Sequence, residues 1–385
     1  MKREAPALEA ALAQLEAAQL RRARVTVRER ALTGRTLTLA DGRELIDFSS
    51  NDYLGLAGHP ALARAMAESA ARAGAGSGAS HLITGHGAEH ARLEEELAAF
   101  TQRERALLFS TGYMANLAVI SALAGRGERV VLDRLCHASL IDGARLSGAR
   151  LVRYAHADAG AAARLLQAEP CRTALLATDG VFSMDGDLAP VPELARCARA
   201  HDAWLLVDDA HGLGVVGDGR GSGFVGNTHI PLPLQMGTLS KAIGSYGGYL
   251  CASRPVVDLI RNRARTLIYS TGLPPACVAA AIAALDLIER DPDYAATPLR
   301  KAKMFTRRVG LAEAQSPIVP VIIGDEEATL AASRMLVEEG YFSAAIRPPS
   351  VPAGTARLRL TFTAKHSDQA IERLADIVRD KIMKR

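Results

Sequence analysis

The chain has 385 residues, and 49% of them are hydrophobic, so it is long enough to form two lobes or a large domain with appendages. Its 46 Lys and Arg residues nearly balance 42 Asp and Glu residues, which argues against a nucleic-acid-binding protein, because such proteins concentrate a basic excess. The five cysteines contain no C-x-x-C pair, so neither a disulfide framework nor a metal site is expected. Lacking a signal-like N-terminus and any apolar run of about 18 residues, the sequence predicts a cytoplasmic protein without a membrane helix.

The N-terminal segment, residues 1–46, is predicted to contain a helix and a hairpin. Leu8, Leu12 and Leu15 recur at helical spacing, which predicts a long helix over residues 4–29. Residues 36–47 carry two apolar stretches on either side of an Asp-Gly turn, a pattern typical of a β-hairpin.

A large domain, residues 47–285, is predicted to be an α/β fold. The glycine-dense residues 74–78 predict a loop, and residues 89–101 have the apolar spacing of an amphipathic helix. Short apolar runs then alternate with helical segments, which predicts a mainly parallel sheet with crossover helices. The runs are residues 106–109, 130–132, 174–177 and 204–207, and the helices include residues 158–169, 192–200 and 274–289.

The remaining residues, 286–385, are predicted to form a smaller C-terminal α/β domain. Strands are expected at residues 318–323, 342–346 and 357–360, and helices at residues 326–339 and 367–383.

Polar residues gather where the predicted strands end, the edge of an open α/β sheet at which ligands bind. The run at residues 204–207 ends in Asp208 and Asp209, and His211 follows. Solvated acids at a strand exit are common. A carboxylate and an imidazole three residues apart at a strand tip favour a functional site.

Lys241 lies in a segment that suits a nucleophilic amine. Hydroxyls of Thr238 and Ser240 flank it, glycines follow it, and apolar strands lie on both sides. A lone lysine beside glycines is usually a surface residue, but a partly desolvated lysine favours the neutral amine that Schiff-base chemistry requires.

Three further strand ends carry candidate groups. Residues 110–116 follow a strand and open a helix, so their N–H groups could hold a phosphate. The triphosphate and dinucleotide fingerprints are missing, which disfavours those ligands. His137 and Ser183 follow other strands, although a single histidine is more often structural.

These segments together resemble the α-oxoamine synthases, a family of fold-type I pyridoxal-phosphate (PLP) enzymes that condense an amino acid with an acyl thioester. The resemblance covers nearly the whole chain. It is carried by D-F-S-S-N-D-Y-L-G-L (47–56), G-S-G-A-S (76–80), S-T-G-Y-M-A-N (110–116), D-R-L-C-H-A-S-L (133–140), G-V-F-S-M-D-G-D (180–187), V-D-D-A-H-G (207–212), T-L-S-K (238–241) and I-Y-S-T (268–271). It implies a large PLP-binding domain with a mainly parallel sheet, a smaller C-terminal domain, and a homodimer.

The resemblance implies four catalytic residues. Lys241 would hold PLP as a Schiff base and then remove the substrate's Cα proton. Asp208 would pair with the pyridinium nitrogen and keep the ring an effective electron sink. His211 would bind the ring's phenolate oxygen, and His137 would stack on the open ring face.

The remaining cofactor and substrate contacts are also implied by the resemblance. The further cofactor contacts would be Gly112, Tyr113, Ser183 and Thr238, with Thr271 reaching the phosphate across a dimer interface. The substrate contacts would be Arg21, Asn51, His137, Ser350 and Arg359, of which Arg359 would bind the amino-acid carboxylate. Ser350 stands where the family has Thr and Asp179 where Glu is common, and neighbouring arginines leave the register of Arg21 open.

Residues 346–361 most resemble the family member of biotin synthesis, which joins L-alanine to a pimeloyl thioester carried on acyl-carrier protein or coenzyme A. Members that make 5-aminolevulinate, 2-amino-3-ketobutyrate or a sphingoid base share the cofactor residues and stay open as alternatives. A nicotinamide-dependent oxidoreductase is disfavoured by the missing fingerprint. A catalytically silent scaffold is disfavoured by the complete set of Lys241, Asp208, His211 and His137.

Overall fold

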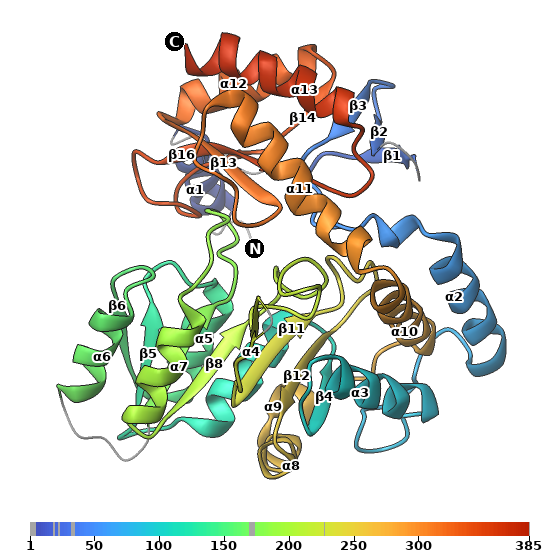
Figure 1. Cartoon of the computed structure of the whole chain (residues 1–385), viewed down its shortest axis with the longest axis vertical. Helices are drawn as coiled ribbons and strands as arrows, with labels where there is room; N and C mark the ends of the chain where they lie inside the picture. Colours follow the sequence, from blue (N-terminus) through green and yellow to red (C-terminus); the bar gives the residue numbers. More distant parts are fainter. Residues whose placement is uncertain are drawn as a thin grey trace. The chain divides into compact units, whose positions relative to one another are not determined.

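The computed structural model describes residues 5–384 except 18–19, 22–23, 32–34, 169–173 and 227 (Figure 1). The chain divides into two compact units. The smaller unit combines residues 1–49 with 320–360, and the larger unit combines residues 50–319 with 361–385. The division at residues 46 and 285 stays a prediction. Among the described residues, no helix has the length and apolarity needed to cross a membrane.

The larger unit is built on a seven-stranded sheet in the order β4-β12-β11-β8-β7-β5-β6. Neighbouring strands from β11 to β6 run parallel, whereas β12 is antiparallel to both β11 and β4, so the predicted mainly parallel sheet is confirmed. The strands are β4 (Arg105–Phe109), β5 (Arg129–Asp133), β6 (Arg150–Tyr154), β7 (Ala174–Asp179), β8 (Ala203–Asp208), β11 (Leu234–Thr238) and β12 (Gly248–Ala252). A short hairpin, β9 (Phe224–Val225) and β10 (Thr228–His229), lies outside this sheet.

Both faces of this sheet are buried, as strand β4 shows. Its Leu108 belongs to one hydrophobic cluster, while Leu107 and Phe109 belong to another, because side chains alternate across a strand. Helices α3 (Ala88–Phe100) and α10 (Pro275–Arg290) contribute to the first cluster, and α4 (Gly112–Leu123) and α8 (Arg254–Arg263) to the second (Figure 1). Such two-sided burial explains why these strands are continuous apolar runs in the sequence.

The helices predicted in this unit are confirmed, with shifted ends. Leu93, Leu97 and Phe100 are buried on α3, as their spacing predicted. The helix predicted over residues 158–169 is α6 (Ala159–Gln167), and its predicted last residue lies outside the described residues. The other helices of the unit's main segment are η1 (Leu56–Gly58), α2 (Pro60–Ala73), α5 (Ala138–Ser147), α7 (Val191–Ala200) and α9 (Arg265–Ile268).

The sequence did not predict helix α11 (Pro292–Val309), which contains Pro298 and packs on α13 (Asp368–Ile377). A proline inside a helical pattern normally marks a helix end, so the pattern was obscured. The helix predicted over residues 367–383 is α13 continued by the π-helical turn η2 (Val378–Met383).

The smaller unit pairs the N-terminal hairpin with a strand from the distant C-terminal part. The predicted hairpin is β2 (Thr36–Leu39) and β3 (Glu44–Asp47), and β14 (Tyr341–Phe342) runs parallel to β3. A second sheet has the order β13-β16-β15, from β13 (Ile318–Gly324), β16 (Ala356–Thr361) and β15 (Ala345–Ile346), and helix α12 (Glu326–Glu338) follows β13.

Two predictions in the smaller unit were wrong. The helix predicted over residues 4–29 ends early: α1 covers Ala5–Ala17, and β1 (Val27–Arg30) pairs with β2, because the β-branched run at residues 25–27 favours extended backbone. The single strand predicted over residues 342–346 is two short strands, since Phe342 pairs with Asp47 and Ala345 pairs with Leu358 in a different sheet.

Candidate active site

Two adjacent acids lie at the end of β8, and each accepts hydrogen bonds from different donors. Asp208 accepts hydrogen bonds from Nδ2 of Asn116 at 2.7 Å and from the N–H of Ala210 at 3.0 Å. Asp209 accepts instead from the N–H of Ser222 at 2.9 Å and from Nε2 of Gln235 at 2.8 Å. Burial raises the pKa of Asp209 to about 6. The donors named here differ for the two carboxylates, as expected when side chains alternate along a strand.

Lys241 lies in the connection between β11 and β12, and this connection is tied across its base. The N–H of Leu239 donates to the carbonyl of Gly247 at 2.9 Å, and Oγ1 of Thr238 donates to the same carbonyl at 2.8 Å. Within the loop, the N–H of Gly244 donates to the carbonyl of Lys241 at 2.9 Å. The lysine is only partly exposed, and its amine is therefore presented from a closed loop rather than from a solvated surface.

His211 connects the lysine to a buried tyrosine. Nζ of Lys241 lies 2.8 Å from Nε2 of His211, and the hydroxyl of Tyr53 lies 2.6 Å from Nδ1 of the same ring. Tyr53 is fully buried, and its hydroxyl also lies 3.3 Å from Oδ1 of Asn51. The sequence predicted Lys241, His211 and Asn51 as site residues, and the larger unit brings the three together.

His137 is connected to Asp208 through two polar side chains. Its Nδ1 lies 2.8 Å from Oγ of Ser139, and that oxygen accepts from Nδ2 of Asn116 at 2.8 Å. The backbone N–H of His137 donates to Asp179 at 3.0 Å. Burial lowers the pKa of His137 and, together with the nearby charge of Asp208, raises the pKa of the Asp179 carboxyl.

Sequence reasoning assigned no role to Tyr53 or Asn116, although both lie inside motifs that carried the resemblance. Asn116 had a detectable signal: it is a lone amide in the otherwise apolar middle of α4, and buried amides need partners. Tyr53 had no comparable local signal, because its partner His211 lies 158 residues away.

The N-terminus of α4 lies against the β11–β12 hairpin. A Cβ at Gly248 would come within 2.4 Å of the backbone nitrogen of Gly112, and a Cβ at Gly112 would meet Thr238 at 3.4 Å. The backbones therefore require glycine at position 248, whereas a Cβ at position 112 would make an ordinary contact. Tyr113 follows, with its ring edge-on to His137 and its hydroxyl donating to Asp142.

The other predicted site residues are distributed as follows. Thr271 is exposed, its carbonyl accepts from Oγ of Ser110 at 3.3 Å, and Ser183 lies partly buried after β7. Arg21, Ser350 and Arg359 belong to the smaller unit. Arg21 is exposed and pairs with Glu16, whereas Arg359 is buried in β16.

The chemistry of this donor set fits PLP. A buried carboxylate, Asp208, can accept from a ring N–H; a partly buried amine, Lys241, can bind an aldehyde carbon; and the N-terminus of α4 can hold an anion. All three features are formed by residues that the structure describes.

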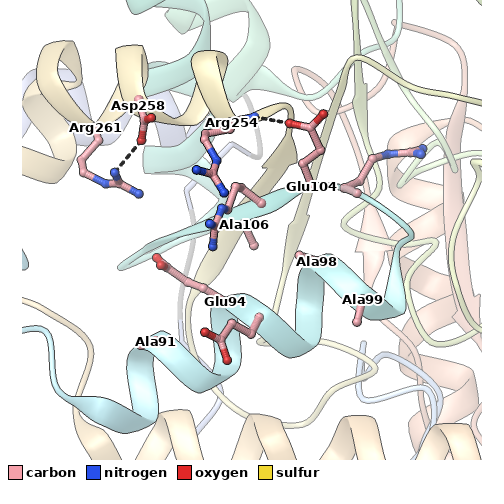
Figure 2. A pocket seen from close by; sticks show the side chains of 12 residues that line it. Ala91, Glu94, Ala98, Ala99, Glu104, Ala106, Arg254, Asp258 and Arg261 are labelled. Atoms are coloured by element: carbon pink, nitrogen blue, oxygen red, sulfur yellow. Dashed lines mark hydrogen bonds and ion pairs between the residues drawn. The ribbon is translucent and has the colours of Figure 1, made fainter.

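A separate hollow of about 550 Å³ lies among α3, β4 and α8, and contains none of the predicted site residues (Figure 2). Figure 2 shows Glu94, Glu104, Arg254 and Arg261 around it, with Arg261 paired to Asp258 at 2.7 Å. Its charged lining consists of Arg103, Arg105, Arg254, Arg261, Glu94, Glu95, Glu104 and Asp258. Four arginines and four carboxyl groups therefore line this hollow.

The sequence of this chain is similar to those of several known proteins. A family model described as "Aminotransferase class I and II" matches residues 43–378. The chain is 54% identical to a putative 8-amino-7-oxononanoate synthase from Parvibaculum lavamentivorans, covering 96% of this chain and 95% of the relative. It is 53% identical to the 8-amino-7-oxononanoate synthase of Maricaulis maris, covering 94% and 93%.

The fold of this chain is also similar to those of solved structures. A serine palmitoyltransferase variant from S. paucimobilis, with a bound PLP–myriocin aldimine, has a TM-score of 0.89 at 29% identity and covers 97% of this chain and 96% of its own. The 8-amino-7-oxononanoate synthase from Francisella tularensis has a TM-score of 0.76 at 26% identity and covers 88% and 98%.

Proposed function

Because the chain belongs to the aminotransferase class I and II family, we propose that it is a PLP-dependent acyltransferase that condenses L-alanine with a pimeloyl thioester, with loss of carbon dioxide, to give 8-amino-7-oxononanoate for biotin synthesis. The observation that carries this proposal is the convergence of Lys241, His211 and Asp208 at one sheet edge, in a chain more than half identical to synthases of that name. The acyl carrier would be acyl-carrier protein or coenzyme A, and the active form would be a homodimer.

PLP, when bound, supplies an electron sink that stabilises negative charge at the substrate's Cα. Asp208 would accept the ring N–H, and its position is fixed by Asn116 and by the N–H of Ala210. The Lys241 amine would hold the cofactor covalently and, as a free amine, would take the proton from the substrate's Cα. His211, 2.8 Å from that amine, would donate to the anionic ring oxygen.

The substrate-binding residues follow from the resemblance. Arg359 would pair with the carboxylate of L-alanine through its planar fork of donors, and Asn51, Ser350 and Arg21 would contact substrate atoms. His137 would contact the cofactor ring, and burial lowers its pKa, which favours the neutral imidazole. Gly112, Tyr113, Ser183 and Thr238 would contact the cofactor, and Thr271 would reach the phosphate in the partner subunit.

The proposal is tested with purified protein loaded with PLP. L-alanine with pimeloyl-CoA, or with pimeloyl-acyl-carrier protein, is expected to release the free thiol and 8-amino-7-oxononanoate, detected by mass spectrometry. The variant Lys241→Ala is expected to form neither. Turnover with glycine or L-serine but not with L-alanine would instead identify another α-oxoamine synthase, and no turnover with any of these pairs would refute the proposal.

A further inference from the structure

Tyr53, His211 and Lys241 form a row of three hydrogen-bonding side chains in the larger unit. The Tyr53 hydroxyl is 2.6 Å from Nδ1 of His211, and Nε2 of the same ring is 2.8 Å from Nζ of Lys241. Tyr53 is fully buried, and His211 is 7% exposed. The mechanism above uses only the Nε2 side of the ring, so the Tyr53 side has no assigned role.

The distances favour His211 as the acceptor of the Tyr53 proton. Among the contacts of the Tyr53 hydroxyl, Nδ1 of His211 lies at 2.6 Å and Oδ1 of Asn51 at 3.3 Å. An O–H···O hydrogen bond is normally about 2.5–3.0 Å long, so the contact with Asn51 is long and weak, whereas the contact with His211 is short. The short contact supports Tyr53 as the donor and Nδ1 as the acceptor.

This direction fixes the tautomer of the imidazole. A ring nitrogen that accepts a hydrogen bond carries no hydrogen, and a neutral imidazole then carries its hydrogen on the other nitrogen. Nε2–H then faces Lys241, and a hydrogen bond across 2.8 Å requires the amine to be the acceptor, which it can be only in its neutral form. The opposite tautomer would present a bare Nε2, which suits an ammonium and not a nucleophilic amine.

Resting on the function proposed above, we propose that Tyr53 is a positioning residue that donates its hydroxyl proton to Nδ1 of His211 and thereby holds the Nε2–H tautomer toward Lys241. The same tautomer supplies a donor for the anionic ring oxygen of the cofactor. Tyr53 would touch neither the substrate nor the cofactor and would act through His211.

The direct test is nitrogen-15 NMR of histidine-labelled protein without cofactor, with His211 assigned by comparison with His211→Asn. In the wild-type protein, Nδ1 is expected to resonate as a bare acceptor and Nε2 as a protonated nitrogen. In Tyr53→Phe, the two signals are expected to move toward each other as the tautomers mix. A wild-type spectrum with hydrogen on Nδ1 would overturn the proposal without any tyrosine variant.

Tyr249→Phe is the matched control. Tyr249 is buried in the same hydrophobic cluster as Tyr53, and its hydroxyl has no hydrogen-bond partner among the described residues. Removing that hydroxyl is expected to leave the His211 signals unchanged. Equal shifts in both variants would show a general loss of core packing and would refute a specific role for Tyr53.

Reactivity of Lys241 gives a second readout without cofactor. Competitive acylation at fixed pH, followed by peptide mass spectrometry, compares Lys241 with Lys303 in the same sample. Tyr53→Phe is expected to slow labelling of Lys241 about threefold to tenfold, the bias that one hydrogen bond gives an equilibrium. Unchanged labelling in Tyr53→Phe would count against the proposal.

Neither measurement requires turnover, so the two proposals fail separately. Protein that shows the Nε2–H tautomer but makes no 8-amino-7-oxononanoate keeps the role of Tyr53 and loses the proposed function. Protein that makes the product, with His211 signals identical in Tyr53→Phe and wild type, keeps the function and loses the role of Tyr53.

Discussion

Asn116, from the middle of α4, donates through Nδ2 to Oδ2 of Asp208 at the end of β8, across 2.7 Å. Both residues are buried, and the same amide nitrogen donates to Ser139, which in turn contacts His137. One amide therefore holds the carboxylate that would face the cofactor nitrogen and connects it to the histidine that would face the cofactor ring.

Asn116→Ala is expected to keep the fold but lower kcat for L-alanine turnover about tenfold to hundredfold. The reason is that a hydrogen bond to a charged group contributes about 1.5–3 kcal/mol, and a misplaced Asp208 would bind the ring N–H poorly. Steady-state kinetics measure the effect. Asn262→Ala is the control, because that exposed amide donates to the backbone of Asp258 within α8, a helix that carries no predicted site residue. Equal kcat values for the two variants would show that Asn116 has no role in the active site.

Asp208→Asn and Asp209→Asn form a matched pair. Asp208→Asn is expected to bind PLP but to lose several orders of magnitude in kcat, because a neutral amide cannot hold the ring nitrogen protonated. Asp209→Asn is expected to retain most activity, since Asp209 binds Ser222 and Gln235. The opposite ranking in the same assay would exchange the roles of the two acids.

His156 is expected to make stability depend on pH. It lies 3.0 Å from Asp133 and 2.7 Å from Asp187, and hydrogen bonds to these carboxylates raise its pKa to about 10. Because the folded-state pKa exceeds the unfolded value, the stabilisation is complete below about pH 6.5 and is lost as pH rises to about 10. After solvent screening it is on the order of 1–3 kcal/mol. Urea unfolding of His156→Gln should lack this decline, whereas His201→Gln should retain it.

Unlike His156, Glu94 is expected to destabilise the fold when it is charged. Burial raises its pKa to about 7, so its ionised form is disfavoured in the folded state. Stability is therefore expected to fall as pH rises from about 4.5 to about 7 and then to level off. Glu94→Gln, which keeps an acceptor for the N–H of Leu108, should unfold at a higher temperature than the wild type at pH 8. Exposed Glu95→Gln is the control, and equal melting temperatures for the wild type and Glu94→Gln would contradict the prediction.

Arg359→Lys is expected to weaken L-alanine binding about tenfold or more while leaving PLP binding intact. An ammonium cannot reproduce the two parallel N–H donors that a guanidinium offers to a carboxylate. Titration of the visible absorbance of the PLP-loaded protein with L-alanine gives the apparent Kd. Arg357→Lys is matched, since both arginines are buried in β16. A larger loss for Arg357→Lys would move the role two residues upstream.

The local sequence pattern was sufficient to predict features that arise within a single helix or strand. The spacing of Leu93, Leu97 and Phe100 predicted α3, and abrupt polar residues after apolar strands predicted Asp208 and the loop of Lys241. These signals are readable because they arise within one strand or helix and the residues that follow it.

Relations between distant segments could not be predicted in the same way. Tyr53 meets His211 across 158 residues, and Asn116 meets Asp208 across 92 residues, so no local periodicity records either pair. The N-terminal helix was predicted too long because the spacing of Leu8, Leu12 and Leu15 gives no information on the pairing of β1 with β2. Helix α11 was not predicted because a proline inside a helical pattern, here Pro298, normally marks the end of a helix.

The hairpin that carries Lys241 is closed at its base by paired backbone groups on Leu239 and Gly247. The register of β12 is fixed by its pairing with β11 and β4, so a residue added or removed between Leu239 and Gly247 must be accommodated within the loop itself. Such a change would displace Lys241 while leaving both strands in place.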